Sequence, residues 1–237
     1  MRLTDTDTVI WQRPGLGSGD TAAALGLSPF KTPLALWQEY KMKIVTLDQG
    51  TAEWLEWRAT GIGASETAAC LGLNPYQSAT DVWEKKLGRG RADAGNVHTR
   101  RGQALEPEAR GLYNGLYKAA MEPVCIVHDS LDWLKASLDG IDFQKKRIIE
   151  IKCPSFKNHA LHLGGDIEEY YTCQIQHQLL LTGFDRCDFI SYNPKDFDRS
   201  EAFVVIPVKA DKDFQHEMLE GLKRFWHCVQ TGEQPTW

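Results

Sequence analysis

The stretch Ser137-Leu138-Asp139-Gly140 and the stretch Glu150-Ile151-Lys152 decide the fold of this chain. Residues 148–153 alternate as in a β-strand, where residues two apart share a face, so Glu150 and Lys152 are expected on one face and the apolar residues between them on the other. Residues 133–141 predict a second strand, and the short polar segment between the two strands predicts a hairpin connection. Asp139 and Glu150 then meet on neighbouring strands.

Two neighbouring carboxylates on one sheet face raise each other's pKa, and burial tends to deprotonate a lysine. A bound counter-ion would stabilise this arrangement. Mg²⁺ takes oxygen ligands at about 2.1 Å and is usually held by one or two carboxylates plus a substrate phosphate. A nearby lysine orients or deprotonates the attacking water, or neutralises developing charge. The spacing alone fits a solvated strand equally well, with Glu150 and Lys152 in cross-strand ion pairs.

Length and composition indicate one large α/β domain. The chain has 237 residues, of which 42% are hydrophobic and 25% charged, as is ordinary for a globular protein. No apolar run approaches the roughly 20 residues of a membrane span, and the N-terminus lacks the apolar region of a signal peptide. The six cysteines contain no C-x2-C pair, so free thiols in a reducing cytoplasm explain them better than a zinc or iron–sulfur site.

The net charge of −5 argues against coating of nucleic acid by the whole surface. It leaves room for a basic channel on an acidic body.

An internal repeat with an offset of 46 relates residues 16–41 to residues 65–87. Each copy predicts a short helix ending at glycine, a turn, and a second helix that carries a tryptophan. Gly19 stands in the first copy where Ser65 stands in the second. The pattern indicates a local duplication whose first copy keeps the shape and loses the chemistry.

Four further positions are candidates for the site. Arg58 and Ser65 combine a guanidinium with a hydroxyl near a helix start, which suits a phosphate; taken by themselves, the two residues fit an N-cap serine and a surface arginine more simply. Glu106 lies beside an apolar stripe near the start of a helix predicted over 102–118, where a solvated glutamate is the alternative. Gln174, in a helix predicted over 166–182, faces a phosphate or a base edge, or is a half-buried amide.

The remaining elements are predicted from hydrophobic periodicity and from the positions of turn-forming residues. Residues 88–101 are polar and basic and predict a mobile loop. The apolar stripe of the 102–118 helix is Leu105, Ala109, Leu112 and Leu116. Pro107 is compatible with this helix only if it lies in the first turn or if the helix is kinked. His159 and His162 are expected on a loop or a helix surface. Further strands are predicted at 123–128, 186–192 and 202–208, and a terminal helix at 211–229.

Five motifs in order carry a resemblance: Trp57-Arg58-x6-Ser65-Glu66, Arg101-Gly102-x3-Glu106, Ser137-x-Asp139-Gly140, Glu150-x-Lys152-Cys153-Pro154 and Tyr171-x2-Gln174-x-Gln176. Over residues 51–228 the chain resembles the phage lambda-type alkaline exonucleases, also called YqaJ-like viral recombinases, of the PD-(D/E)xK nuclease superfamily. Leu138 departs from the superfamily's nominal proline, a position whose side chain does no chemistry.

The resemblance implies an α/β fold: a restriction-endonuclease-like PD-(D/E)xK core with a central mixed β-sheet flanked by helices. It implies an exonuclease domain at 51–237, with residues 1–50 as an extension carrying a degenerate copy of the 61–87 segment. The implied activity is Mg²⁺-dependent, 5′-to-3′ digestion of one strand of duplex DNA to 5′-mononucleotides, leaving a 3′ overhang. The resemblance further implies a homotrimeric ring threaded by DNA and a partner protein that anneals single strands. It also implies that the protein acts in the cytoplasm of a bacterial host.

The resemblance also assigns the metal ligands. Asp139, Glu150 and the carbonyl of Ile151 would hold one ion. Glu106 and Asp139 would hold a second, about 3.5 to 4 Å away, as two-metal hydrolysis requires. Lys152 would help prepare the water, and Mn²⁺ is a possible substitute for Mg²⁺.

The remaining roles concern the DNA. Arg58 and Ser65 would take the terminal 5′-phosphate, and Gln174 would help place the water or the scissile group. Two alternatives remain: a structure-specific or nicking endonuclease on the same core, and a catalytically silent clamp that binds DNA ends. The set Glu106, Asp139, Glu150 and Lys152 argues against the clamp.

Overall fold

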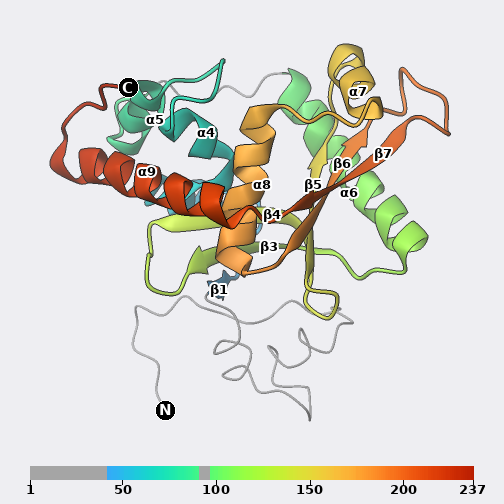
Figure 1. Ribbon diagram of the computed structural model, residues 1–237, viewed down its shortest axis with the longest axis horizontal. Coiled ribbons are helices and arrows are strands. Elements are labelled where there is room, and N and C mark those ends of the chain that lie inside the picture. Colours follow the sequence, from blue (N-terminus) through green and yellow to red (C-terminus); the bar gives the residue numbers. More distant parts are fainter. Residues whose placement is uncertain (1–41, 91–96) are drawn as a thin grey trace, which may run out of the picture.

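A mixed β-sheet with helices on both faces forms the described part of the chain, residues 42–90 and 97–237 of a computed structural model (Figure 1). The strands are β1 (Met42–Val45), β2 (Ile62–Gly63), β3 (Glu122–His128), β4 (Leu134–Asp142), β5 (Arg147–Lys152), β6 (Arg186–Tyr192) and β7 (Phe203–Lys209). The helices are α3 (Ala52–Ala59), the 3-10 turn η1 (Ala64–Glu66), α4 (Thr67–Cys70), α5 (Ala79–Lys86), α6 (Val97–Tyr117), α7 (Phe156–Leu163), α8 (Glu169–Thr182) and α9 (Lys212–Thr231). The expected α/β core with a central mixed sheet is confirmed.

The strand order puts β4 and β5 in the middle of the sheet. The order is β1-β3-β4-β5-β6-β7, with β2 beside β4. β4 and β5 form the predicted antiparallel hairpin, in which Gly140 lies opposite Ile149. β5 pairs in parallel with β6, which makes the sheet mixed. One further step of the hairpin register brings Asp139 next to Glu150, as the sequence predicts.

Helix α8 covers one face of the sheet. Its Ile175 and Leu179 are fully buried in the main hydrophobic core with Ile148 of β5. The helix starts at Glu169, three residues later than the predicted start at 166, because Glu168 is extended. It ends where Gly183 adopts a φ of 67°, a left-handed conformation that favours glycine.

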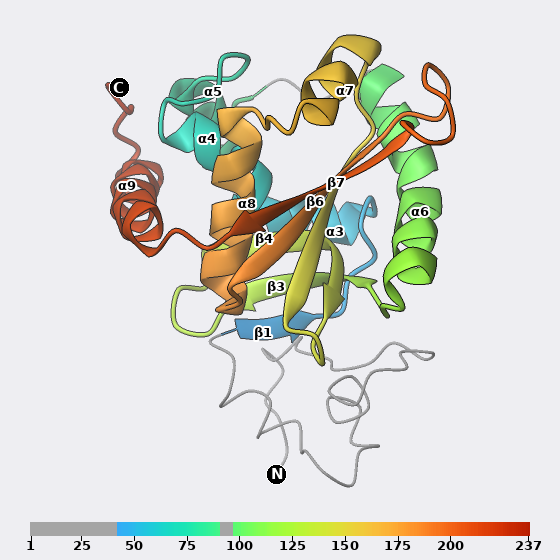
Figure 2. The ribbon, with the colours of Figure 1, turned by 45° about the vertical axis from the view of Figure 1, so that its right-hand side comes forward.

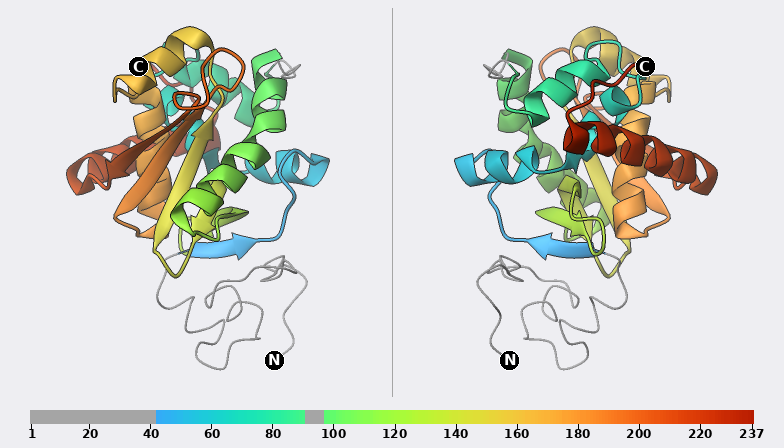
Figure 3. Two further views of the ribbon diagram at one scale, coloured as in Figure 1. Left: turned by 90° about the vertical axis from the view of Figure 1, so that its right-hand side faces the viewer. Right: turned by 90° about the vertical axis from the view of Figure 1, so that its left-hand side faces the viewer.

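Helix α6 covers the opposite face (Figure 2). It begins at Val97, so the predicted loop over 88–101 is wrong for residues 97–101, which are helical; residues 91–96 lie outside the described residues. Pro107 stands inside the helix, where it removes one backbone donor. The helix changes direction along its length (Figure 3), as the kink alternative predicts.

The buried face of α6 differs from the predicted stripe. Ala109 and Tyr113 are fully buried, whereas Leu112 and Leu116 are 41% and 68% exposed. The predicted burial of the apolar stripe is therefore wrong at Leu112 and Leu116. Tyr113 takes the inner position because its ring is buried against the sheet while its hydroxyl donates to the buried carboxylate of Asp188. A polar tip with a partner makes a tyrosine suitable for burial.

His159 and His162 are fully buried in α7, so the surface expectation is wrong. The Nδ1 atom of each histidine lies 2.7 Å from the Ser191 hydroxyl oxygen on β6. The Nε2 of His159 lies 2.9 Å from the Glu201 carbonyl, and that of His162 lies 2.7 Å from the Glu168 carboxylate. These contacts hold α7 against β6 and the start of α8.

The second repeat copy has the predicted form. α4 is followed by Gly72 with a φ of 75°, and α5 carries the buried Trp83. The first copy, residues 16–41, and residues 1–41 of the predicted extension lie outside the described residues. β1 precedes the predicted domain start at residue 51 and pairs antiparallel with β3.

The C-terminal elements follow the prediction within a few residues. β6 and β7 are antiparallel neighbours, and α9 buries Met218, Leu222 and Phe225 in the main core. Among the helices in the described ranges, none has the length and hydropathy of a membrane span.

Candidate active site

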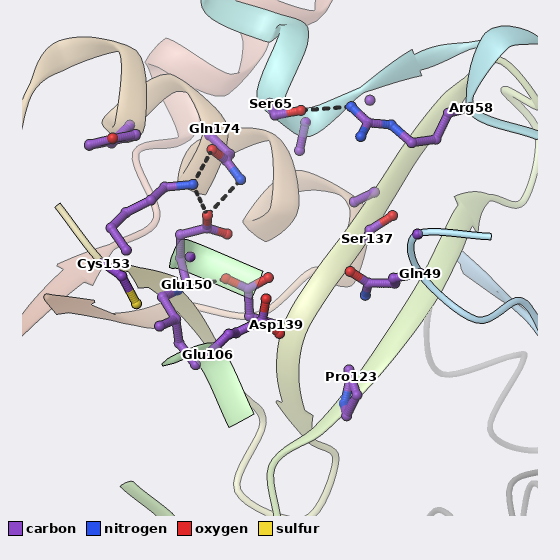
Figure 4. Close-up of a pocket in the computed structure, with 18 of the residues that line it drawn as sticks. Gln49, Arg58, Ser65, Glu106, Pro123, Ser137, Asp139, Glu150, Cys153 and Gln174 are labelled. Carbon is purple, nitrogen blue, oxygen red and sulfur yellow. Dashed lines mark hydrogen bonds and ion pairs between the residues drawn. The ribbon is translucent and has the colours of Figure 1, made fainter. Parts of the chain in front are cut away.

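A cleft of about 1380 Å³ contains every residue selected from the sequence as a site residue. Its walls come from β4, β5, α6, α8 and the segment from α3 to η1 (Figure 4). The selected residues are Arg58, Ser65, Glu106, Asp139, Glu150, Ile151, Lys152 and Gln174. Segments far apart in the sequence thus meet in one place.

Asp139 is fixed by the backbone of the neighbouring strand. Its Oδ2 accepts a hydrogen bond of 2.7 Å from the amide of Ile151. Gly140 allows Ile149 of β5 and Met121, the residue before β3, to pack against β4, because a Cβ at this position would lie 2.7 Å from Cγ1 of Ile149 and 2.9 Å from Cβ of Met121. The glycine that follows Asp139 is therefore required by packing.

Glu150 is only 1% exposed, yet both of its oxygens have partners. Oε1 accepts a 2.7 Å hydrogen bond from Gln174, and Oε2 accepts a 2.6 Å hydrogen bond from Gln178. The Lys152 ammonium lies 2.5 Å from Oε1. Burial of a carboxylate is tolerated when it is paired and hydrogen-bonded, so these contacts hold Glu150 in place.

Lys152 links this carboxylate to α8. Its Nζ donates to the side-chain oxygen of Gln174 at 3.2 Å and lies 4.8 Å from the centre of the Tyr171 ring. Burial alone would lower the pKa of Lys152, but the carboxylates of Glu150 and Asp139 outweigh burial and raise this pKa above its usual value. The side chain is therefore a cation that stabilises negative charge in the cleft.

Glu106 approaches the same place from α6, and Figure 4 shows its carboxylate beside those of Asp139 and Glu150. Arg110, one helical turn later, donates to Glu106 at 3.1 Å and also donates to the backbone carbonyl of Asp139. This arginine ties α6 to β4. It holds Glu106 over the strand that carries Asp139.

The three carboxylates repel one another in a desolvated setting. Burial raises the pKa of Glu106, Glu150 adds to this effect, and Arg110 opposes it. Burial raises the pKa of Asp139 well above its usual range, and Glu150 and Glu106 raise it further. Such perturbed carboxylates in a cleft are typical of functional sites.

The donor set fits a hard divalent cation. Carboxylates and a backbone carbonyl are the ligands that Mg²⁺ prefers, and they come here from Glu106, Asp139, Glu150 and Ile151. Within residues 42–90 and 97–237, however, no group of three or more His, Cys, Asp or Glu side chains is already arranged to hold a metal. Backbone, glutamine and lysine donors contact Asp139 Oδ2 and both oxygens of Glu150.

Arg58 and Ser65 form a second polar pair at the edge of the cleft (Figure 4). The guanidinium donates to the Ser65 hydroxyl at 2.9 Å. Its central carbon lies 4.6 Å from the centre of the Trp54 ring, and stacking on an aromatic ring fixes the plane of a guanidinium. A positioned guanidinium beside a hydroxyl suits a phosphate group.

Among the residues that contact the selected side chains, Trp54, Arg110 and Gln178 were not themselves selected from the sequence. Each lies four residues from a selected residue on the same helix, namely Arg58, Glu106 and Gln174. Residues four apart on a helix are neighbours. This spacing was the signal that could have identified all three.

Comparison with known proteins gives one family match and several structural matches. The model of the YqaJ-like viral recombinase domain matches residues 53–185. A curated relative, Uncharacterized protein R354 of Acanthamoeba polyphaga mimivirus, is 33% identical over 97 residues, which are 40% of this chain and 18% of that protein. The chain therefore spans less than a fifth of that relative's length.

Three of the matching solved structures are of exonucleases. The alkaline exonuclease LHK-Exo from Laribacter hongkongensis superposes with a TM-score of 0.68 at 24% identity, covering 77% of this chain and 94% of that one. LHK-Exo in complex with dAMP gives 0.65 at 23% identity, with the same coverage. A phage-related exonuclease from Haemophilus somnus gives 0.52 at 15% identity, covering 72% of this chain and 92% of that one. At these identities the likeness establishes the fold.

Proposed function

Because this chain belongs to the YqaJ-like viral recombinase domain family, we propose that it is a divalent-metal-dependent 5′-to-3′ exonuclease acting on linear double-stranded DNA. Family and fold together support a nuclease. The observation that carries the finer proposal is that one cleft holds both the carboxylate–lysine group and the Arg58–Ser65 pair. The products would be 5′-mononucleotides and a 3′ overhang, and the complex of LHK-Exo with dAMP is consistent with a mononucleotide product.

Four residues would hold the metal. Asp139, Glu150 and the Ile151 carbonyl would bind one Mg²⁺, and Glu106 with Asp139 would bind a second, with Mn²⁺ as a substitute. When bound, the metal would supply a Lewis acid that activates water and neutralises charge on the leaving oxygen. An ionised carboxylate has about four lone-pair sites, so an oxygen that accepts one hydrogen bond would still have a lone pair for the ion.

Lys152 and Gln174 would prepare the reacting groups. The Lys152 ammonium, held next to Glu150 and Gln174, would help orient the attacking water and stabilise charge that develops on the phosphoryl oxygens. Gln174 donates to Glu150 and accepts from Lys152. It therefore fixes their relative position, and it would help place the water or the scissile group.

Arg58 and Ser65 would set the direction of digestion. A terminal 5′-phosphate carries more charge than an internal phosphodiester, so a guanidinium paired with a hydroxyl grips it more strongly. With that phosphate bound at the edge of the cleft, the next phosphodiester would lie toward the carboxylates. An end without the phosphate would be held less well.

The experiment that tests this function follows release of acid-soluble nucleotides from linear duplex DNA, with and without Mg²⁺. We compare 5′-phosphorylated ends, 5′-hydroxyl ends and a covalently closed circle. Mg²⁺-dependent loss of the linear DNA, faster with the phosphate and absent on the circle, is the expected result. Cutting of the circle would favour the endonuclease, and binding without cutting would favour the clamp.

Replacing Arg58 with alanine is expected to slow digestion of 5′-phosphorylated ends by about 10- to 100-fold, because a hydrogen bond to a charged group contributes roughly 1.5–3 kcal/mol. Digestion of 5′-hydroxyl ends should change little, since those ends lack the charged partner. Initial rates on the two substrates measure the effect, and Arg199→Ala, at an exposed arginine, is the matched control. An equal fall in the digestion rate of both substrates would contradict a phosphate-binding role of Arg58.

We further propose a homotrimeric ring threaded by DNA, which acts with a single-strand-annealing protein in the cytoplasm of a bacterial host. The resemblance to the family implies these properties. A net charge of −5 is compatible with a ring because only its lumen need be basic. Light scattering on the purified full chain is expected to give three times the mass of one chain. A monomer at micromolar concentration would contradict the ring.

A further inference from the structure

The backbone of Arg58 is held by a lysine that the proposed reaction does not use. The Nζ atom of Lys86, in the last turn of α5, donates to the Arg58 carbonyl at 3.0 Å. The last carbonyls of a helix lack donors within the helix, and a lysine near a helix C-terminus is favourable. Lys86 therefore fixes the end of α3 from which the Arg58 side chain extends.

The same lysine also reaches the segment that carries Ser65. Its Nζ lies 2.8 Å from Oε2 of Glu66, the residue after Ser65. That oxygen in turn accepts a 2.8 Å hydrogen bond from the amide of Gly63. Lys86 and Glu66 thus connect the end of α3 to η1, the two segments that must stay in register for Arg58 to meet Ser65.

The ion pair between Lys86 and Glu66 is largely buried. Only 4% of the Lys86 side chain and 16% of the Glu66 side chain are exposed. Breaking a largely buried ion pair leaves a charge without compensation, unlike loss of a surface pair.

The internal repeat shows that the general sequence pattern of the segment can occur without the lysine of this ion pair. With the offset of 46, Asp20 corresponds to Glu66 and Tyr40 corresponds to Lys86. The first copy therefore lacks the lysine, as it lacks the serine of the candidate phosphate site. Both residues occur together in the second copy.

We propose that Lys86 and Glu66 are positioning residues that set the preference of this chain for a 5′-phosphorylated DNA end. They act through Arg58 and Ser65 and touch no reacting atom. This inference rests on the proposed function, because it assumes that Arg58 and Ser65 bind the terminal phosphate. It predicts that loss of Lys86 or Glu66 reduces discrimination between ends more than it reduces hydrolysis.

The test uses Lys86→Met and Glu66→Gln in the full chain, with Lys85→Met and Glu56→Gln, at exposed neighbours, as matched controls. The readout is the ratio of rates on 5′-phosphorylated and 5′-hydroxyl ends, measured on the same enzyme sample, so that the fraction of folded protein cancels. The ratio is expected to fall about tenfold in the test variants and to stay unchanged in the controls. Adding Arg58→Ala to Lys86→Met should lower the ratio no further than Arg58→Ala alone.

An unchanged ratio, or an equal loss on both ends, would overturn the proposal and leave Lys86 with a structural role only. Glu66→Gln exchanges a single atom, so it carries the test if Lys86→Met does not fold. The ratio of dissociation constants for the two ends, measured without Mg²⁺, provides a second readout. A wild-type chain that prefers phosphorylated ends but hydrolyses neither would contradict the proposed function, while this binding ratio would still decide the role of Lys86.

Discussion

Replacing Asp139 with asparagine is expected to lower hydrolysis of linear duplex DNA by on the order of 10³-fold or more. The substitution keeps the shape and the hydrogen bond from the Ile151 amide, but it removes a charge shared by both proposed metal positions. Several kcal/mol of charge stabilisation in the transition state correspond to this factor. Nucleotide release at saturating Mg²⁺ measures the effect.

Binding of DNA ends by the Asp139→Asn variant should stay the same or become tighter, because the Arg58–Ser65 pair is intact and one negative charge near the DNA phosphates is gone. Folding stability should not fall, since the lost charge is desolvated and lies near Glu106 and Glu150. Asp213→Asn, at an exposed position of α9, is the control. Substantial residual turnover by the purified variant would contradict the role of Asp139.

The centre of the fold was predictable because two local signals agreed there. Alternation over residues 148–153 defined the faces of β5, and the short connection from β4 fixed the hairpin register, which is also set by which face is buried. Asp139 and Glu150 could therefore be brought together from the sequence alone. Neither step required knowledge of distant contacts.

The buried face of α6 was not predictable in the same way. Leu112 and Leu116 fit a helical stripe as well as Tyr113 does, and hydrophobicity favours the leucines. The choice depends on Asp188, 75 residues away from Tyr113 along the chain. The burial of His159 and His162 likewise depends on Ser191, which no local pattern identifies.

For the candidate site, residue type and order indicated which side chains gather, but not what holds them. Arg110 donates to Glu106, four residues before it, and Gln178, four residues after Gln174, shares with Gln174 the helix face that donates to Glu150. Helical spacing could have identified both residues. Lys86 is different, because it supports Arg58 across 28 residues through a backbone carbonyl. A hydrogen bond to a carbonyl depends on the fold and leaves no signature of side-chain type in the partner.

Lys152→Met is expected to reduce hydrolysis by roughly 10²- to 10³-fold, the range found when one group that stabilises transition-state charge is lost. Methionine keeps much of the length of the side chain but removes the cation next to Glu150 and the donor to Gln174. Binding of DNA ends should be largely retained, since it depends on Arg58 and Ser65. Single-turnover rates with saturating enzyme separate the chemical step from binding.

The same variant should respond to metal more strongly than the wild-type chain. Without Lys152, Glu150 stays buried next to two other carboxylates, which destabilises the metal-free protein and favours cation binding. Because a ligand stabilises the folded state in proportion to its binding free energy, Mg²⁺ should raise the melting temperature of Lys152→Met more than that of the wild type. Lys157→Met, at an exposed position of α7, should match the wild type. If Mg²⁺ shifted the melting temperature of Lys152→Met no more than that of this control, the carboxylates around Lys152 would not be the metal site.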